Sequence, residues 1–297
     1  MKPKLSFHDL LEKLYEKGIS NGSYSEEEII SYLRQRSYYY KISSYRKNFP
    51  KLSDGKYSSL TFDHLTATAN LDVRLREYLL NLCLDVEHAT RTSIMTTLTD
   101  DENEDGYTII ENYQDYYPEK FQEIMSHFRT NSYKKDMFRK RTQISSWVFM
   151  EIIDYGALVQ FLEFYLQQNP ESKSILYPSQ HKFIKNIRNA CAHNNVFLIN
   201  LFDKTDYVPR PEAATKSYAS TMKINLGLVH YPKVIDIINL FYLHTRLCSP
   251  QLNQRRYTEG LKILRKYEDS KDLLSQSTPI SKIIESILRK SIDFLSK

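Results

Sequence analysis

The sequence predicts an all-α protein. Only 7 of its 297 residues are Gly and 10 are Pro, so few positions interrupt a helix. Apolar residues recur every three or four positions through most of the chain, which places them on one helix face, whereas the alternating pattern of strands is rare. We therefore expect an N-terminal helical subdomain over residues 1–55 and a larger helical domain over residues 56–297.

Two short helices begin the N-terminal subdomain. Residues 5–17 carry apolar side chains on one face and end at Gly18, a residue typical of helix C-termini. Ser25 and Glu28 have the spacing of a capping box, in which each side chain accepts a hydrogen bond from the other residue's backbone N–H. A second helix should therefore continue through Leu33.

A tyrosine-rich segment completes the subdomain over residues 37–49. It contains Tyr38, Tyr39, Tyr40, Lys41, Tyr45, Arg46 and Lys47. Aromatic rings beside cations can stack on nucleobases, but tyrosines more often pack between domains. We expect packing, with base stacking as the alternative.

A long helix is expected over residues 71–98, because its apolar residues recur at the spacing of a bundle helix. Two oppositely charged pairs are one turn apart along it, Asp72 with Arg76 and Glu87 with Arg91. Arg76 and Glu87 fall within about 20° of each other around the helix axis. These charges form either a solvated face or a ladder that lines a cleft.

Charged loops are expected between residues 100 and 141. Residues 100–106 are acidic, but their spacing does not match an EF-hand, so we expect an exposed loop without a metal ion. The densest basic patch of the chain follows. We expect it to contact an RNA backbone, with a solvated loop as the alternative. Its members are Lys134, Lys135, Arg139, Lys140 and Arg141.

A core helix is expected over residues 145–166. It holds the single tryptophan of the chain, Trp147, among apolar residues at helical spacing. Gly156 has no side chain and would let another helix approach closely.

The most informative stretch spans residues 179–199. Ser179 is the expected N-cap of a half-buried helix, whose polar edge carries Arg188, Asn189 and His193 near its C-terminus. An arginine fork can hold a phosphate, and a histidine, which titrates near neutral pH, can move a proton. The trio therefore suits phosphodiester chemistry. The alternative is a histidine that only complements the helix dipole.

The C-terminal third carries weaker signals. Residues 203–230 are expected to form a long loop, because prolines and mixed polar residues replace the helical pattern. Pro232 can open a helix, and two further amphipathic helices are expected over residues 254–267 and 279–295.

Several of these segments resemble the Abi-like (AbiD/AbiF) abortive-infection proteins of bacteria. The family's Y-Y-x-(I/L)-S-x-Y-x-x-x-F string is similar to residues 39–49, and its W-x-x-x-E-x-x-x-x-G block is similar to residues 147–156. Its D-x-x-L-R and I-E-x-x-x-R patterns resemble residues 72–76 and 86–91, with Val86 in place of Ile. R-N-x-x-A-H at residues 188–193 resembles the R-x(4–6)-H motif of HEPN ribonucleases.

This resemblance implies a HEPN-like helical bundle with additional C-terminal helices. It also implies a metal-independent endoribonuclease of an anti-phage or toxin-type system, with Arg188, Asn189 and His193 as its catalytic residues. The RNA 2′-hydroxyl would attack the adjacent phosphate while His193 moves the proton and Arg188 stabilises the developing charge. HEPN nucleases pair two such motifs, so a homodimer is expected. The supporting residues would be Asp72, Arg76, Glu87 and Arg91.

Other classes of function are disfavoured. The sequence has no P-loop, dinucleotide-binding glycine motif, zinc-protease motif or serine-hydrolase motif, so we expect no cofactor. The three cysteines are far apart among apolar neighbours, which predicts buried reduced thiols. No apolar run approaches the roughly 20 residues that cross a bilayer, and the first residues lack a signal-peptide pattern, so we expect a cytoplasmic protein without a membrane partner.

Two alternatives to a ribonuclease remain. The first is a protein that grips a structured small RNA without cleaving it. The second is a DNA-binding regulator that uses the N-terminal helices as a helix-turn-helix and binds duplex DNA with a steep salt dependence. The net charge of +5 permits a nucleic-acid partner without requiring one.

Overall fold

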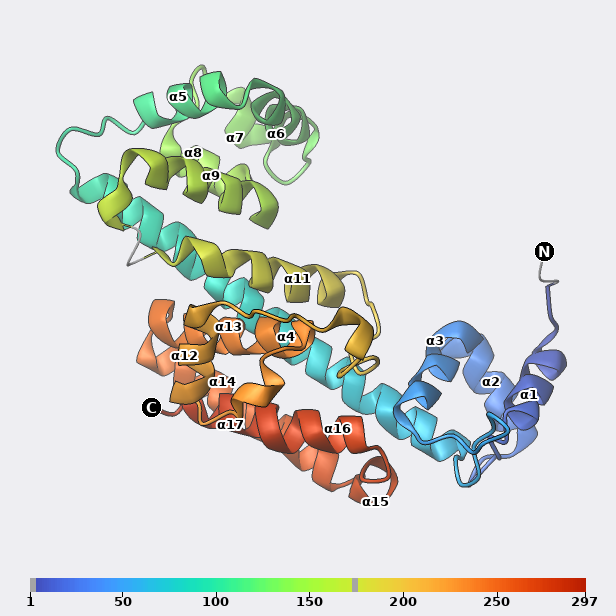
Figure 1. Cartoon of the computed structure of the whole chain (residues 1–297). Helices are drawn as coiled ribbons and strands as arrows, with labels where there is room; N and C mark the ends of the chain where they lie inside the picture. Colours follow the sequence, from blue (N-terminus) through green and yellow to red (C-terminus); the bar gives the residue numbers. More distant parts are fainter. Residues whose placement is uncertain (1–3, 173–175) are drawn as a thin grey trace.

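The computed structural model describes residues 4–172 and 176–297. Within these ranges the chain forms helices and no β-strand, apart from one isolated bridge between Ser20 and Thr61 (Figure 1). The prediction of an all-α helical bundle is confirmed.

Helix α4 (Phe62–Asp100) is the axis of the molecule. Its 39 residues span about 58 Å, and the other helices form three groups along it (Figure 1). The first group, at the N-terminal end of α4, consists of α1 (Phe7–Glu16), α2 (Glu26–Gln35), α3 (Tyr39–Ser44) and the 3₁₀ turn η1 (Tyr45–Asn48). The second group, at the opposite end, consists of α5 (Thr108–Tyr116), α6 (Pro118–Thr130), α7 (Lys135–Arg139), α8 (Ser146–Ile152) and α9 (Tyr155–Gln168).

The third group packs along the middle of α4. It consists of α11 (His181–Ala192), α12 (Ala213–Thr221), α13 (Pro232–Leu247), α14 (Pro250–Glu268), α15 (Lys271–Leu274), α16 (Thr278–Ile283) and α17 (Arg289–Phe294). A π-helical stretch, η6 (Ile284–Leu288), joins α16 to α17. Short 3₁₀ turns are η2 (Pro170–Ser172), η3 (Pro178–Gln180), η4 (Lys204–Asp206) and η5 (Leu226–Leu228).

The N-terminal group has its own small core. The predicted capping box of Ser25 and Glu28 is present at the start of α2. Gly18 has φ +77°, and a Cβ there would collide with the backbone of Tyr57, so only glycine fits easily after α1. The side chains of α1–α3 bury themselves against Phe62 and Leu65 of α4, which are fully buried. The first turns of α4 therefore belong to this core.

The main core surrounds the middle of α4. Leu75, Leu79, Leu82 and Val86 are fully buried, which confirms the predicted bundle helix. Helix α4 begins nine residues earlier than the stretch expected from the sequence, at Phe62. The three cysteines are buried and free, as predicted.

The single helix predicted over residues 145–166 is wrong. Two helices, α8 and α9, replace it, and the backbone is extended at Ile153. Asp154 then caps α9, because its Oδ1 accepts a 2.8 Å hydrogen bond from the N–H of Ala157. Trp147 is also not a core residue, since 47% of its surface is exposed and its ring packs edge-on against Tyr107.

Two other expectations are corrected. Ser179 does not cap α11, because it lies inside the 3₁₀ turn η3 and Gln180 occupies the N-cap position. The long loop expected over residues 203–230 contains α12, which is held by a 3.0 Å hydrogen bond from the buried Asn239 amide to Thr215.

Candidate functional site

Helix α11 buries one face and presents the other to a cleft. Ile184, Ile187 and Cys191 are buried in the main core. On the other side, Arg188 and Asn189 line a cleft of about 570 Å³ between α11 and α9. The remaining lining residues are Lys120, Asp154, Tyr155, Gly156, Val159, Gln160, Glu163, Lys182 and Lys185. The lining contains one arginine and three lysines but only two carboxylates, so the cleft carries a net positive charge.

His193 lies at the exposed C-terminus of the same helix. It is the C-cap residue, its N–H donates to the Asn189 carbonyl at 3.0 Å, and Asn194 with φ +59° ends the helix. In the described part of the chain its imidazole has no hydrogen-bond partner, so the ring is open to a ligand. His193 does not line the cleft. It follows Arg188 by five residues, so the two side chains point about 140° apart around the helix axis. The structure therefore brings Arg188 and Asn189 together and places His193 one turn farther on.

Arg188 is half-buried and incompletely paired. Its Nη1 lies 3.4 Å from Oδ1 of Asn189, and its Nε is buried without a partner among the described residues. An unpaired guanidinium donor inside a protein costs free energy, so the site gains if an anion engages this side chain.

The buried pair Asp72 and Arg76 lies beneath the segment that follows His193. Asp72 is fully buried and accepts a 2.8 Å hydrogen bond from Arg76 Nε and a 2.9 Å bond from the Tyr45 hydroxyl. Its other oxygen accepts from the backbone N–H groups of Phe197 at 2.9 Å and Leu198 at 2.6 Å. One carboxylate thus joins α4 and η1 to the chain after α11.

Arg76 and two further side chains fix the same segment. Arg76 Nη1 donates to Oδ1 of Asn194, and Lys41 Nζ of α3 donates to the Asn194 carbonyl at 2.9 Å. Lys233 of α13 donates to the carbonyls of Phe197 at 2.7 Å and Ile199 at 2.6 Å. Lys233 was not predicted from the sequence as a site residue, and Lys41 was named only as part of the tyrosine-rich segment. The end of α11 is therefore held from α3, α4 and α13 together.

Glu87 and Arg91 act at a different place. They pair at 2.6 Å, and Arg91 also donates to the carbonyls of Met150 and, at 3.0 Å, Ile153. This pair holds the C-terminus of α8, which explains the break before α9. Neither of the two predicted pairs, Asp72 with Arg76 and Glu87 with Arg91, forms a solvated face.

The predicted basic patch lies on and around α7, in the group of α5–α9. Lys135, Arg139, Lys140 and Arg141 are exposed on and after α7, while Lys134 donates to the Glu151 carbonyl. Helix α7 packs on α6 and shares no hydrogen bond with α11 within the described ranges. No member of the patch lines the cleft of Arg188.

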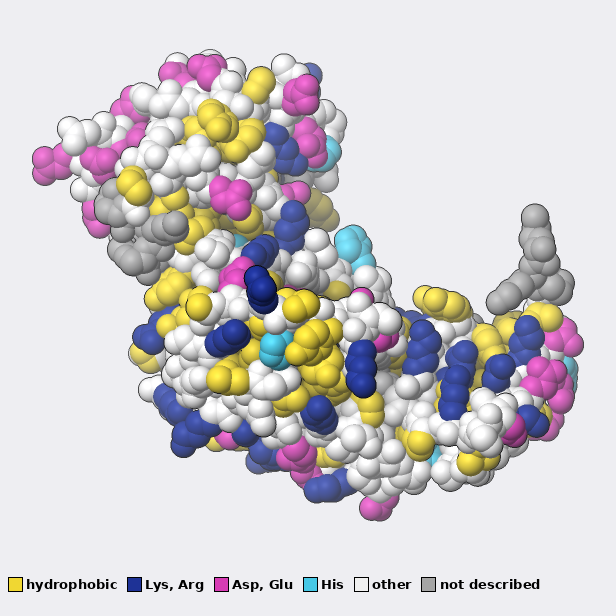
Figure 2. Space-filling model, viewed as in Figure 1, with side chains coloured by type: hydrophobic (Ala, Val, Ile, Leu, Met, Phe, Trp, Pro, Cys, Tyr) yellow, Lys and Arg dark blue, Asp and Glu magenta, His cyan; other side chains and the backbone are white. Residues whose placement is uncertain are grey.

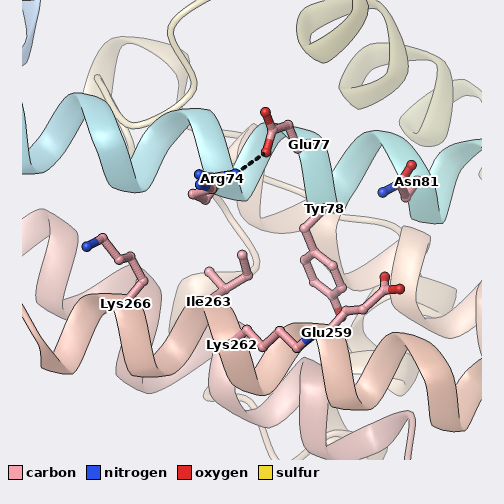
Figure 3. Close-up of a pocket in the computed structure, with 8 residues that line it drawn as sticks. All are labelled: Arg74, Glu77, Tyr78, Asn81, Glu259, Lys262, Ile263 and Lys266. Atoms are coloured by element: carbon pink, nitrogen blue, oxygen red, sulfur yellow. Dashed lines mark hydrogen bonds and ion pairs between the residues drawn. The ribbon is translucent and has the colours of Figure 1, made fainter.

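A second cleft lies between α4 and α14. Figure 3 shows the Tyr78 side chain reaching from α4 toward α14. The lining includes Arg74, Glu77 and Asn81 from α4 and Glu259, Lys262 and Lys266 from α14. The Tyr78 hydroxyl donates to the Arg256 carbonyl at 3.0 Å, and Ile263 completes the lining. In this cleft of about 340 Å³, the two carboxylates offset much of the positive charge.

A buried acid beneath α11 makes stability depend on pH. Burial raises the pKa of Asp236 on α13 to about 7, although Asn186 of α11 donates a 3.3 Å hydrogen bond to it and Lys233 is near. The folded state therefore holds this proton more tightly than the unfolded chain. The contribution of Asp236 to the free energy of unfolding should therefore fall by roughly 1 kcal/mol per pH unit from about pH 4 to about pH 7. The buried His181, whose pKa burial lowers to about 4, contributes a slope of the opposite sign up to about pH 6.5.

Urea unfolding at several pH values measures this dependence. Asp236→Asn should make the slope of the free energy of unfolding against pH more positive than in the wild type, because the amide cannot ionise and only the opposing slope of His181 remains. Burial lowers the pKa of Lys233 to about 8, so its loss of charge lies mostly above this window. Equal slopes in the two proteins would show that Asp236 ionises normally.

Comparison with known families identifies the chain. A family model for Abi-like proteins matches residues 31–198, which is more than half of the 297-residue chain. The chain belongs to the Abi-like protein family. The match includes α3, α4 and α11, and it ends at Leu198, whose N–H binds Asp72. Membership suggests that this Abi-like protein functions in abortive infection.

Other comparisons add nothing to the family match. No curated protein and no solved structure matches the Abi-like chain. Among the described residues, no helix combines the length and the apolar character that crossing a membrane requires.

Proposed function

We propose that this Abi-like protein is a metal-independent endoribonuclease of the HEPN type. The observation that carries the proposal is the end of α11, where an unpartnered, exposed His193 follows Asn189 and Arg188 by one turn. The cleft beside them is lined by further cations, which suits a polyanion. Family membership supports the setting of this activity in an abortive-infection system.

The reaction is a transesterification. The 2′-hydroxyl oxygen bonds to the adjacent phosphorus, and the bond from phosphorus to the 5′-oxygen breaks. His193 carries a proton from the attacking oxygen or to the leaving oxygen, and Arg188 stabilises the charge on the phosphoryl oxygens. Asn189 orients the imidazole or contacts the phosphate. The products are a 2′,3′-cyclic phosphate and a 5′-hydroxyl.

A second copy of the chain completes the site in this proposal. Strand cleavage uses both an acid and a base, and one protomer offers one histidine at this helix end. A two-fold interface can place a residue near its own copy, so two α11 C-termini would supply both groups. The Abi-like protein should therefore sediment as a dimer, and a monomer mass at assay concentration would contradict this part.

The deciding experiment is cleavage of a labelled, structured RNA in EDTA with identification of the product ends. Cyclic phosphate and 5′-hydroxyl ends are expected. The same RNA with a 2′-deoxy nucleotide at the cleaved position should stay intact there, because the nucleophile is missing. Cleavage that needs an added metal ion, or that leaves 5′-phosphates, would contradict the mechanism. Tightly bound RNA recovered intact would instead favour an RNA-binding protein without catalysis.

A further inference from the structure

A third groove lies among the N-terminal helices. It is bounded by α2, α3 and α4 and has a volume of about 300 Å³, at the lower limit of ligand pockets, which are roughly 300–1,000 Å³. Its polar and aromatic lining includes Tyr24, Tyr32, Arg36, Tyr38, Lys41 and Asn70. No carboxylate is among its lining residues in the described chain, in contrast to the clefts beside α9 and α14.

The aromatic side chains of this groove are partly fixed and partly free. Tyr24 and Tyr32 pack edge-on against Phe62, with ring centroids 5.2 Å and 5.4 Å away, which anchors them to the N-terminal core. Tyr38 is 63% exposed at the start of α3. The expectation that the tyrosine-rich string serves packing therefore holds for the buried Tyr45 and fails for Tyr38 and Tyr40, which are 63% and 80% exposed.

Cations accompany these rings. The Arg36 guanidinium lies 5.9 Å from the centroid of the Tyr32 ring. Burial lowers the pKa of Lys41, with a further contribution from Arg76, and its Nζ donates to the Asn194 carbonyl at 2.9 Å. Asn194 directly follows His193, so Lys41 links the groove to the end of α11.

A broad hollow lies beside the N-terminal helices. Figure 2 shows the molecule hollowed between the N-terminal helices and the group of α5–α9, with Lys and Arg side chains gathered over the N-terminal helices. Helix α11 lies between these two groups in the same view (Figure 1).

We propose that the groove of Tyr38 binds a nucleobase of single-stranded RNA whose neighbouring phosphates are held at Arg36 and Lys41. Stacking on an aromatic face combined with cations along the backbone is the chemistry by which single strands are bound without base pairing. The inference rests on the proposed function in taking RNA as the ligand, and it assigns a strand-binding subsite beyond the reacting phosphate.

The test is a binding titration with a labelled single-stranded RNA of about 12 nucleotides, using full-length protein carrying His193→Ala so that the probe stays whole. Adding Tyr38→Ala should weaken binding roughly tenfold, while Tyr38→Phe keeps the stacking face and should bind as the reference does. Arg36→Ala should reduce the dependence of affinity on salt, whereas Tyr38→Ala should leave that slope unchanged.

Tyr40→Ala is the matched control. Tyr40 is on the same helix and is 80% exposed, but it lines the neighbouring cleft with Lys13 and Arg46 rather than the groove. Unchanged affinity in Tyr38→Ala, or an equal loss in Tyr40→Ala, would overturn the subsite.

The result separates the subsite from the nuclease. If the wild type cleaves RNA and Tyr38→Ala does not change RNA binding, the subsite is wrong and the proposed nuclease activity is unaffected. Tyr38-dependent binding without any cleavage by the wild type would support the subsite and count against the nuclease.

Discussion

Replacing His193 by alanine is expected to slow RNA cleavage by roughly 10²–10⁴-fold, the range for removal of a group that transfers a proton in the transition state. The free energy of unfolding should change by less than about 0.5 kcal/mol, because the side chain is exposed and makes no hydrogen bond within the described chain. Single-turnover cleavage rates and urea unfolding of the same preparations measure both quantities.

His88→Ala provides the control for this prediction. His88 is an exposed histidine on α4, and it lines neither the cleft of Arg188 nor the groove of Tyr38. The His88→Ala protein should cleave RNA at the wild-type rate. If His193→Ala retains the wild-type rate, or if its loss of rate follows a loss of stability, His193 is not the proton-transfer group.

Replacing Asp72 by alanine is expected to lower the free energy of unfolding by about 3–5 kcal/mol. The change leaves the Arg76 guanidinium, which is 4% exposed, without its counter-charge. It also removes the acceptor for the Tyr45 hydroxyl and for the N–H groups of Phe197 and Leu198. The urea midpoint should fall with little change in the slope.

Two variants make the Asp72 prediction specific. Glu77→Ala breaks an exposed ion pair with Arg74 on the same helix and should cost at most about 1 kcal/mol. Adding Arg76→Met to Asp72→Ala should recover part of the loss, because it removes the unpaired buried charge. A loss below about 1 kcal/mol in Asp72→Ala, or no recovery in the double variant, would show that the carboxylate does not hold this segment.

The sequence predicted the helices that bury a single continuous stripe. In α4 the stripe of Leu75, Leu79 and Leu82 was sufficient to predict a bundle helix. The earlier turns were missed because Phe62 and Leu65 face a different core, so no single stripe runs through the whole helix. The break at Ile153 was also missed, because a contact that is distant in sequence stabilises it. It depends on a hydrogen bond from Arg91, which is 62 residues away in the chain.

The candidate site was predictable only in its local part. The spacing of Arg188, Asn189 and His193 placed them on the last turns of one helix, where they are observed. The contacts that hold that helix end could not be read from spacing, because Lys41 and Asn194 are 153 residues apart in the sequence. Pairing of such distant residues depends on the folded chain and leaves no periodic pattern.

The continuity of α4 limits how the length of this protein can change. The N-terminal core uses the first turns of α4, and Asp72 and Arg76, which reach the end of α11, follow within a few turns. One residue added between Ala69 and Asp72 would turn the two ends about 100° relative to each other and move them about 1.5 Å apart. We therefore expect relatives to differ in length within their loops and not within this part of α4. Even seven added residues, which restore the facing side chains, would separate the two ends by about 10 Å and break the hydrogen bond from Tyr45 to Asp72.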